Sequence, residues 1–251
     1  MDAVVVSYNS AHDLGGLLAC APLRASFRSL TVVDSASTDG SAEMAERAGV
    51  EVIRRSSNDG FGAAANTGIR STSSSLVALL NPDIRFSHDD VPARLAHRFA
   101  DPRVGLAAPK LLLPGGMAQD SARAVPTPLD LILRRRLQRV RGAIRPAQVA
   151  TVPWVVGACV VLRRCAFDDV GGFDERFFLY FEDVDLCVRL SHAGWKVLMD
   201  PEVSVLHHHR AASRKSIFGR STRQHVRSAI RFYRTHPYHI FRPRISQKQL
   251  C

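Results

Sequence analysis

Residues 30–48 read LTVVDSASTDGSAEMAERA, which is a run of apolar residues, a turn rich in Ser, Asp and Gly, and a stretch with helical spacing. The same order repeats on both sides of this segment. The apolar runs predict buried strands at 3–7, 30–34, 50–53 and 76–80, with helices at 12–20, 41–48 and 63–69 between them. Strands that alternate with helices form a parallel sheet through right-handed crossovers, so we predict an α/β fold of the Rossmann-like kind.

The second half of the chain continues the pattern less regularly. It predicts strands at 106–113, 154–162 and 197–206 and a helix at 182–192. Residues 114–153 contain many Pro and Gly residues around an arginine-rich stretch, 134–145, and we expect a variable, partly mobile excursion. Residues 216–236 have spacing compatible with a helix.

Charge is unevenly distributed along the 251 residues. The net charge is +11, yet residues 1–202 hold 23 basic and 23 acidic side chains, whereas residues 203–251 hold 11 basic side chains and no acidic one. A basic C-terminal tail on a neutral body suggests an anionic partner, either nucleic acid or acidic lipid headgroups.

Membrane and redox signals are absent from the sequence. No run of 18 apolar residues occurs and the N-terminus has no basic region before its apolar run, so we expect neither a membrane span nor a signal peptide. The five cysteines show no metal-binding spacing, and we expect reduced thiols in a cytoplasmic protein, with Cys159 and Cys187 in the core.

Four polar motifs follow the predicted strands in order. They are VSYN (6–9), VDSASTDGS (33–41), NDGFGAAANTG (58–68) and LNPD (80–83). Loops beyond the carboxyl ends of parallel strands form the ligand crevice of such sheets, so we expect all four to line one pocket. Asp34 and Asp39 offer acceptors to a pyrimidine N–H and to ribose hydroxyls. Alternatively, both are turn and helix-cap residues.

The third and fourth motifs suggest contacts with a phosphate-bearing ligand. Gly60, Gly62 and Gly68 would let the main chain approach the ligand, and Asn66, at the start of a helix, could orient a sugar or phosphate. Asp83 follows an apolar strand, where a carboxylate facing a pyrophosphate suits Mg²⁺ or Mn²⁺. The alternative is a surface turn after Pro82.

A fifth motif, FDERFFLYFEDVDLCVR (173–189), places bulky apolar residues directly before three acids at a helix start. The helix dipole favours carboxylates at this position without any catalytic role. Alternatively, Asp183 beside an apolar wall is a general base whose proton affinity is tuned by its neighbours.

Together, the five ordered motifs resemble those of the family-2 inverting glycosyltransferases with the GT-A fold. The fifth is most similar to the rhamnosyltransferase-like branch that builds bacterial cell-surface polysaccharides. The resemblance covers residues 2–209 and implies a nucleotide-diphosphate sugar as donor, such as dTDP-rhamnose or a UDP-sugar. It implies a lipid-linked or polysaccharide acceptor and single displacement with inversion.

The resemblance also implies residue roles. Asp183 would be the catalytic base, Glu182 would position the acceptor, and Asp83 with His207 would hold Mg²⁺ or Mn²⁺. Neighbouring His208 and His209 leave the choice of histidine open. Asn81 stands where many relatives have the first acid of the metal-binding motif, and Ser35 replaces a commoner Asn. The donor set is Ser7, Tyr8, Asn9, Asp34, Asp39, Gly62, Asn66 and Asn81, and the acceptor set is Trp154, Gly157 and Glu182.

The expected organisation is a catalytic domain at 1–209 followed by a basic tail at 210–251. Within the domain, 1–113 would bind the nucleotide sugar, 114–153 is the excursion, and 154–209 would carry acceptor and catalytic groups. We expect the tail to hold the protein on an anionic membrane surface at the cytoplasmic face. One alternative is an inactive nucleotide-sugar-binding protein. The other, a nucleic-acid-binding protein, is disfavoured because the tail has few interleaved aromatics for base stacking.

Overall fold

The computed structural model describes residues 1–20, 26–86, 88–137, 142–208 and 220–241. The strands are β1 (Asp2–Ser7), β2 (Leu30–Asp34), β3 (Glu51–Arg54), β4 (Leu76–Leu80), β5 (Ile84–Arg85), β6 (Val104–Leu112), β7 (Ala122–Arg123), β8 (Ala143–Ile144), β9 (Ala150–Thr151), β10 (Trp154–Val155), β11 (Cys159–Arg163) and β12 (Lys196–His207). The helices are α1 (Ala11–Leu18), α3 (Ser41–Arg47), α4 (Phe61–Ser71), α5 (Val91–His97), the 3₁₀ turn η1 (Arg98–Ala100), α6 (Pro128–Leu137), α7 (Arg164–Asp169), α8 (Glu182–His192), α9 (Arg220–Thr235) and α10 (Tyr238–Phe241).

The central sheet has the strand order β3-β2-β1-β4-β11-β6-β12-β5, with β9 beside β12. Strands β3, β2, β1 and β4 are parallel, and so are β6 and β12. Since β11 is antiparallel to both β4 and β6, β6 and β12 run in the direction of β4. The predicted mostly parallel sheet is confirmed, and the carboxyl ends of β1, β2, β4, β6 and β12 share one edge.

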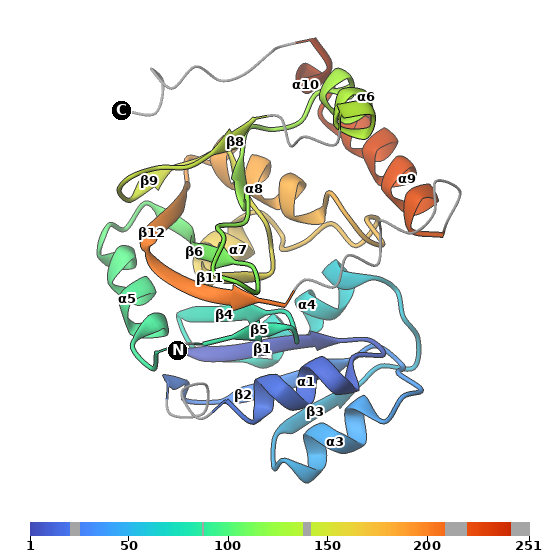
Figure 1. Ribbon diagram of the computed structural model, residues 1–251, viewed down its shortest axis with the longest axis vertical. Coiled ribbons are helices and arrows are strands. Elements are labelled where there is room, and N and C mark those ends of the chain that lie inside the picture. Colours follow the sequence, from blue (N-terminus) through green and yellow to red (C-terminus); the bar gives the residue numbers. More distant parts are fainter. Residues whose placement is uncertain (21–25, 87, 138–141, 209–219, 242–251) are drawn as a thin grey trace.

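Helices cover both faces of this sheet (Figure 1). On β1, Val4 and Val6 belong to the core cluster that includes residues of α4, α7 and α8, whereas Ala3 and Val5 belong to the cluster that includes residues of α1, α3 and α5. Alternate residues of a strand point to opposite faces, so a strand covered on both sides needs an unbroken apolar run. The run at 3–6 meets that need.

The prediction of a single strand at 154–162 is wrong. The chain leaves the ladder at 156–158, so β10 pairs with β7 in a separate three-stranded sheet, while β11 lies in the central sheet between β4 and β6. A hydrogen bond from the Gly157 amide to the Asp183 carboxylate occupies this break. An apolar string alone does not reveal where a strand changes sheets.

The segment predicted as an excursion, 114–153, contributes to both sheets. It contains β7, α6, β8 and β9, and β9 pairs with β12 in the central sheet. Residues 138–141 of its arginine-rich stretch lie outside the described residues.

The predicted tail is in part a component of the domain. In α9, Ala229 and Phe232 join the core cluster that also contains Phe181, and Phe232 is fully buried. Helices α9 and α10 therefore pack on the body, next to α6 at the top of Figure 1. Residues 210–219 and 242–251 of the predicted tail lie outside the described residues. None of the described helices combines the length and apolar character needed to cross a membrane.

Candidate functional site

The loops after β1 and β2 are joined by side-chain hydrogen bonds. The Thr38 amide donates to Asn9 Oδ1 at 2.8 Å, and the Ala11 amide donates to Asp39 Oδ2 at 2.9 Å. Ser41 also donates to Asp39 through its amide and its hydroxyl. The first two predicted motifs therefore meet, as expected for the edge where parallel strands end. Asp39 uses both carboxylate oxygens to link α1 with α3, so its cap role is the one that the contacts show.

Asp34 keeps an oxygen available at this edge. Its side chain is buried, and Oδ2 accepts a hydrogen bond from the Ser37 amide at 3.0 Å. Oδ1 is also buried, and no described residue donates to it. A buried carboxylate oxygen without a donor is costly unless a ligand satisfies it. Oδ1 can therefore accept a hydrogen bond from an N–H or O–H group of a ligand.

The acidic pair lies at the start of α8. Asp183 Oδ1 accepts from the Val184 amide at 2.8 Å, and Oδ2 accepts from the Gly157 amide at 3.2 Å. The Asn81 amide donates to the Ala158 carbonyl, which ties the loop after β4 to the same segment. The fourth and fifth motifs are thus brought together through the 157–158 backbone.

The two acids differ in their surroundings. Burial raises the pKa of Asp183, and the Gly157 and Val184 amides counteract this by stabilising the carboxylate. Burial, followed by the charge of Asp183, raises the pKa of Glu182 well above its usual range, and no described group donates to Glu182 Oε2. Asp183 is therefore the member that ionises first, and Glu182 retains its proton to higher pH.

Asp83 and His207 approach each other at the same edge. Ile84 of β5 pairs with His207 at the end of β12, which places His207 Nε2 3.4 Å from Asp83 Oδ2. His207 Nδ1 lies 2.7 Å from Gln119 Oε1, and because an amide oxygen only accepts, Nδ1 carries the proton. An imidazole nitrogen beside a carboxylate is a donor set that fits Mn²⁺ better than Mg²⁺, because Mg²⁺ prefers oxygen ligands.

Several residues with strained backbone conformations lie around this edge. The described non-glycine residues with positive φ are Asn9, Ala36, Tyr180 and Phe181, at φ values of 47°, 59°, 69° and 70°. The first two lie in the loops after β1 and β2, and the last two immediately precede the acidic pair. Residues held in such sparsely populated backbone conformations often cluster at functional sites, where the surrounding structure maintains them.

The third motif contacts the 173–178 segment. A Cβ on Gly60 would lie 2.3 Å from the Phe178 carbonyl oxygen, and one on Gly62 would lie 3.0 Å from Phe173 Cβ. Asn66 lies in the second turn of α4, not at its start, and its buried amide bonds the Phe173 backbone on both sides. In this structure Gly62 and Asn66 hold the 173–178 segment, and donor contacts for them stay a prediction.

Two further residues of the predicted sets are covered. Ser7 is fully buried, with its hydroxyl 2.9 Å from that of Ser10, so it supports the loop after β1. Trp154 is buried, its indole N–H donates to the Ala124 carbonyl, and Arg123 lies over its ring. This leaves Trp154 almost no surface for an acceptor. Tyr8 is 51% exposed and Asn81 is half-buried, so both remain accessible.

Sequence reasoning missed Gln119 and Arg123. Gln119 sets the His207 tautomer from 88 positions away, and the charge of Arg123 lowers the pKa of Asp183. Neither residue belongs to a recognisable motif. The β6–β7 connection brings Gln119 to the site, and pairing of β7 with β10 brings Arg123, so only the folded chain reveals them.

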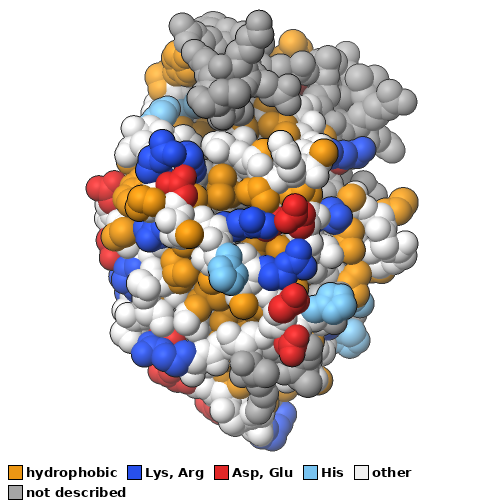
Figure 2. Space-filling model, turned by 90° about the vertical axis from the view of Figure 1, so that its left-hand side faces the viewer, with side chains coloured by type: hydrophobic (Ala, Val, Ile, Leu, Met, Phe, Trp, Pro, Cys, Tyr) orange, Lys and Arg blue, Asp and Glu red, His pale blue; other side chains and the backbone are white. Residues whose placement is uncertain are grey.

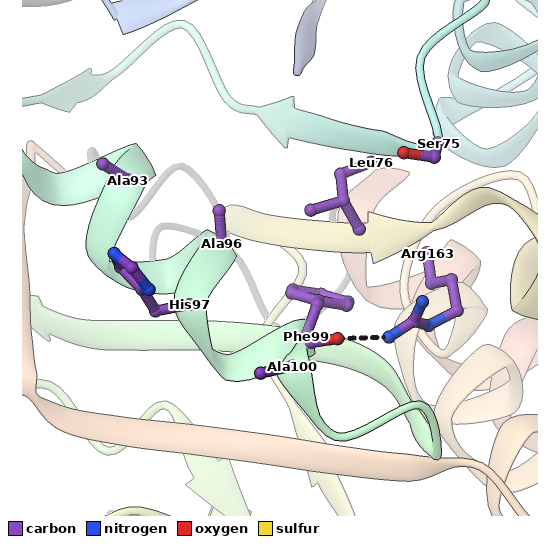
Figure 3. A pocket seen from close by; sticks show the side chains of 8 residues that line it. All are labelled: Ser75, Leu76, Ala93, Ala96, His97, Phe99, Ala100 and Arg163. Carbon is purple, nitrogen blue, oxygen red and sulfur yellow. Dashed lines mark hydrogen bonds between the residues drawn. The ribbon is translucent and has the colours of Figure 1, made fainter.

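A hollow of about 590 Å³ lies between η1, α5 and the start of β4 (Figure 3). Its lining is largely small and apolar, and Arg163 uses its guanidinium on the Phe99 carbonyl at 2.7 Å and on other backbone oxygens. It lies toward the amino-terminal end of β4, away from the motif-bearing edge. The side that faces left in Figure 1 shows acidic and basic side chains intermixed (Figure 2). Because the predicted motifs lie at the carboxyl edge and the hollow does not, we place the candidate site at the carboxyl edge.

Comparison with known sequences decides the family. The family described as Glycosyl transferase family 2 matches residues 2–171, which is more than half of the chain. The chain belongs to this family. It is thus a glycosyltransferase, as the five motifs predict.

Two proteins similar in sequence to this chain are rhamnosyltransferases, which agrees with the predicted branch of the family. The chain is 32% identical over 237 residues to the N-acetylglucosaminyl-diphospho-decaprenol L-rhamnosyltransferase of Mycobacterium tuberculosis, covering 83% of this chain and 76% of that protein. It is 30% identical over 165 residues to the rhamnosyltransferase WbbL of Escherichia coli, covering 62% of this chain and 60% of WbbL. The glycosyltransferase is therefore rhamnosyltransferase-like in sequence.

A solved structure supports the GT-A fold. The mannosyltransferase PcManGT from Pyrobaculum calidifontis, in complex with GDP-Man and Mn²⁺, superposes with a TM-score of 0.65 at 18% identity. The match covers 96% of this chain and 65% of that one, so this chain spans slightly less than two thirds of its length. At this identity the likeness concerns the fold alone.

Proposed function

We propose that this glycosyltransferase transfers rhamnose, with inversion, from a nucleoside-diphosphate donor to a lipid-linked acceptor sugar in cell-surface glycan synthesis. The observation that carries the proposal is that one edge of the sheet bears the Asp183 carboxylate held by the Gly157 amide, the Asp83–His207 pair and the available oxygen of Asp34. The rhamnosyl group and the diphosphate-linked acceptor are supported by the names of the relatives.

In the proposed reaction, Asp183 acts as the base. Its carboxylate takes the proton of the acceptor hydroxyl while that oxygen attacks the anomeric carbon, and the bond from this carbon to the donor diphosphate breaks. The nucleoside diphosphate leaves with the electron pair of the broken bond. Two backbone amides hold the Asp183 carboxylate in place before the reaction, and its raised pKa makes it a stronger proton acceptor than an exposed aspartate.

Donor recognition would use the rest of the edge. Asp34 Oδ1 would accept the N–H of a pyrimidine base, and Asn81 and Tyr8 lie in the loops that would border the donor. When bound, Mg²⁺ or Mn²⁺ would stabilise the charge on the leaving diphosphate, with Asp83 and His207 as its protein ligands. Among the described residues no group of three or more His, Cys, Asp or Glu could hold a metal ion.

The proposed location is the inner membrane face, reached from the cytoplasm. The basic residues of 210–244 would be attracted to anionic lipid, each contributing about 1 kcal/mol near the surface. Because α9 supplies Phe232 to the core, truncation at Arg210 would disturb the fold and is not a clean test of this attraction.

Transfer assays test the function directly. The protein would be incubated with dTDP-rhamnose, UDP-sugars or GDP-mannose, with and without Mn²⁺, and with N-acetylglucosamine linked through a diphosphate to a short prenol. We expect dTDP-rhamnose to raise the melting temperature most and to yield a product whose anomeric configuration, measured by NMR, is opposite to that of the donor. Retained configuration, or transfer from a different donor only, would contradict the proposal.

A further inference from the structure

A groove of about 950 Å³ runs along α9, and none of its lining residues is assigned to the reaction above. One wall is the 176–178 segment that precedes the acidic pair, and the other is α9 itself. Arginine side chains line it from both walls, namely Arg176, Arg223, Arg227, Arg231 and Arg234. We call this feature the α9 groove.

The four arginines of α9 form one stripe. Their spacing of four, four and three residues places them on one face of the helix, and all four are exposed. No carboxylate among the described residues forms an ion pair with them, and the sequence has no Asp or Glu after Glu202. Like charges at this spacing destabilise a helix, so a bound anion would relieve a repulsion that the protein itself leaves in place.

Elsewhere the described arginines are often neutralised by acids. Arg28 pairs with Asp2, and Arg98 pairs with Asp200, each at less than 3 Å. In the groove, only Arg176 has such a partner, Asp174, at 2.7 Å. The stripe on α9 is therefore distinct from the balanced charge of the body, which is visible as intermixed red and blue on the side shown in Figure 2.

Apolar side chains lie beside these cations. Phe178 is 38% exposed and Ile230 is 50% exposed, and both line the α9 groove. A ligand that satisfies both kinds of wall carries phosphate and an apolar chain. Arginine suits the phosphate because its planar guanidinium can donate two parallel hydrogen bonds to it.

The 176–178 wall of the α9 groove belongs to the segment that continues directly into Glu182. The Ser228 hydroxyl donates to the Leu179 carbonyl at 2.9 Å, three residues before Glu182. The Phe181 ring, which directly precedes Glu182, packs on Phe232 with centroids 5.3 Å apart. Ser228 and Phe232 lie on the buried face of α9, so these contacts fix the helix, with its arginine stripe on the outer face, against the segment that ends at the start of α8.

We propose that the α9 groove binds the diphosphate of the lipid-linked acceptor and so places the acceptor sugar beside Glu182 and Asp183. This inference rests on the proposed function, which supplies the acceptor class, and adds the site that would recognise it. The proposed binding is recognition of a diphosphate headgroup, which differs from the general attraction of a basic surface to anionic lipid.

Vesicle binding by the full chain tests the groove. Phosphatidylcholine vesicles would contain geranylgeranyl diphosphate or, at equal surface charge, phosphatidylglycerol. We expect about tenfold tighter binding to the diphosphate vesicles, reversed by inorganic pyrophosphate. Equal binding to both vesicles, or no competition by pyrophosphate, would overturn the proposal in favour of general attraction to anionic lipid.

Charge-preserving variants make the test specific. The double variant R227K/R231K keeps the net charge but loses the bidentate donors, so its preference for the diphosphate vesicles should fall severalfold. R47K makes the same change on exposed Arg47 of α3 and should keep the preference. An unchanged preference in R227K/R231K, or an equal loss in R47K, would refute the assignment of the groove.

The two proposals fail in different ways. Vesicle binding requires no turnover, and transfer to a phosphate-free glycoside of N-acetylglucosamine requires no diphosphate recognition. Transfer by the unaltered protein without selective vesicle binding would remove only the groove assignment. Selective binding without transfer from any donor would remove the proposed function and with it the acceptor role of the groove.

Discussion

Replacement of Asp183 by Asn tests the proposed base without changing the size of the side chain. Both oxygens of Asp183 accept backbone hydrogen bonds, from Val184 and Gly157, whereas Asn has only one acceptor. The variant loses about 1 kcal/mol from one hydrogen bond, but it also removes a buried charge beside Glu182. These effects oppose each other, so we expect D183N to fold and to bind donor as the unaltered protein does.

The effect on turnover should be much larger. Loss of a general base lowers the rate by about 10²–10⁴, which corresponds to about 2.7–5.4 kcal/mol of transition-state stabilisation. Because burial raises the pKa of Asp183, the unaltered protein should lose activity on acidification at a pH above the usual pKa range of an aspartate. D183N should lack this pH dependence.

Single-turnover transfer, with donor affinity measured by calorimetry, would check both expectations. Asp168→Asn makes the same chemical change at an exposed site on α7 and serves as the control. Turnover of D183N within a few-fold of the unaltered protein, or persistence of its acid limb, would refute the assignment of the base.

Three further changes address the metal, the acidic pair and the C-terminal helix. Asp83→Ala should abolish the Mn²⁺ dependence of donor affinity in calorimetry, and an unchanged Mn²⁺ response would move the metal elsewhere. Glu182 has a raised pKa in the folded state. Its contribution to the free energy of unfolding therefore declines, by up to about 1.4 kcal/mol per pH unit, as the pH rises from the pKa of Glu182 in the unfolded chain toward its pKa in the folded protein. The free energy of unfolding of Glu182→Gln minus that of the unaltered protein, measured in urea, should therefore be more positive at pH 8 than at pH 4.5. The same difference at both pH values would contradict this. Phe232→Ala should cost about 3–5 kcal/mol of unfolding free energy, since its ring is fully buried, and a loss below about 1 kcal/mol would show that α9 is not part of the core.

Local sequence patterns predicted the sheet because its signal is local. Residues buried on both faces of a strand must be apolar in succession, and the runs at 3–7, 30–34 and 76–80 show this directly. Parallel direction then follows from the alternation of strands and helices, and the shared edge follows from the parallel direction. The expectation that Asp34 and Asp83 lie toward one edge depended only on these steps, whereas the role of Asp183 came from the resemblance to the family.

The roles of individual residues depended on contacts between distant parts of the chain. Asn66 and Gly62 look like ligand-binding residues in the sequence, but the 173–178 segment packs against them. Polar and glycine residues serve a ligand or a neighbouring backbone equally well, so their type does not distinguish the two. The break between β10 and β11 was hidden for the same reason, because an apolar residue suits either sheet.

The amino-acid sequence by itself determined the α/β class, the order of the motifs, the family and the concentration of positive charge after residue 202. Only the tertiary structure decided that Gln119 orients His207, that Gly157 holds Asp183, and that α9 packs on the body with its arginines along a groove. The physical reason is the range of the interactions. Periodicity and backbone preference act over a few residues, whereas these hydrogen bonds and packed surfaces join segments separated by tens of residues, and they exist only once the chain has folded.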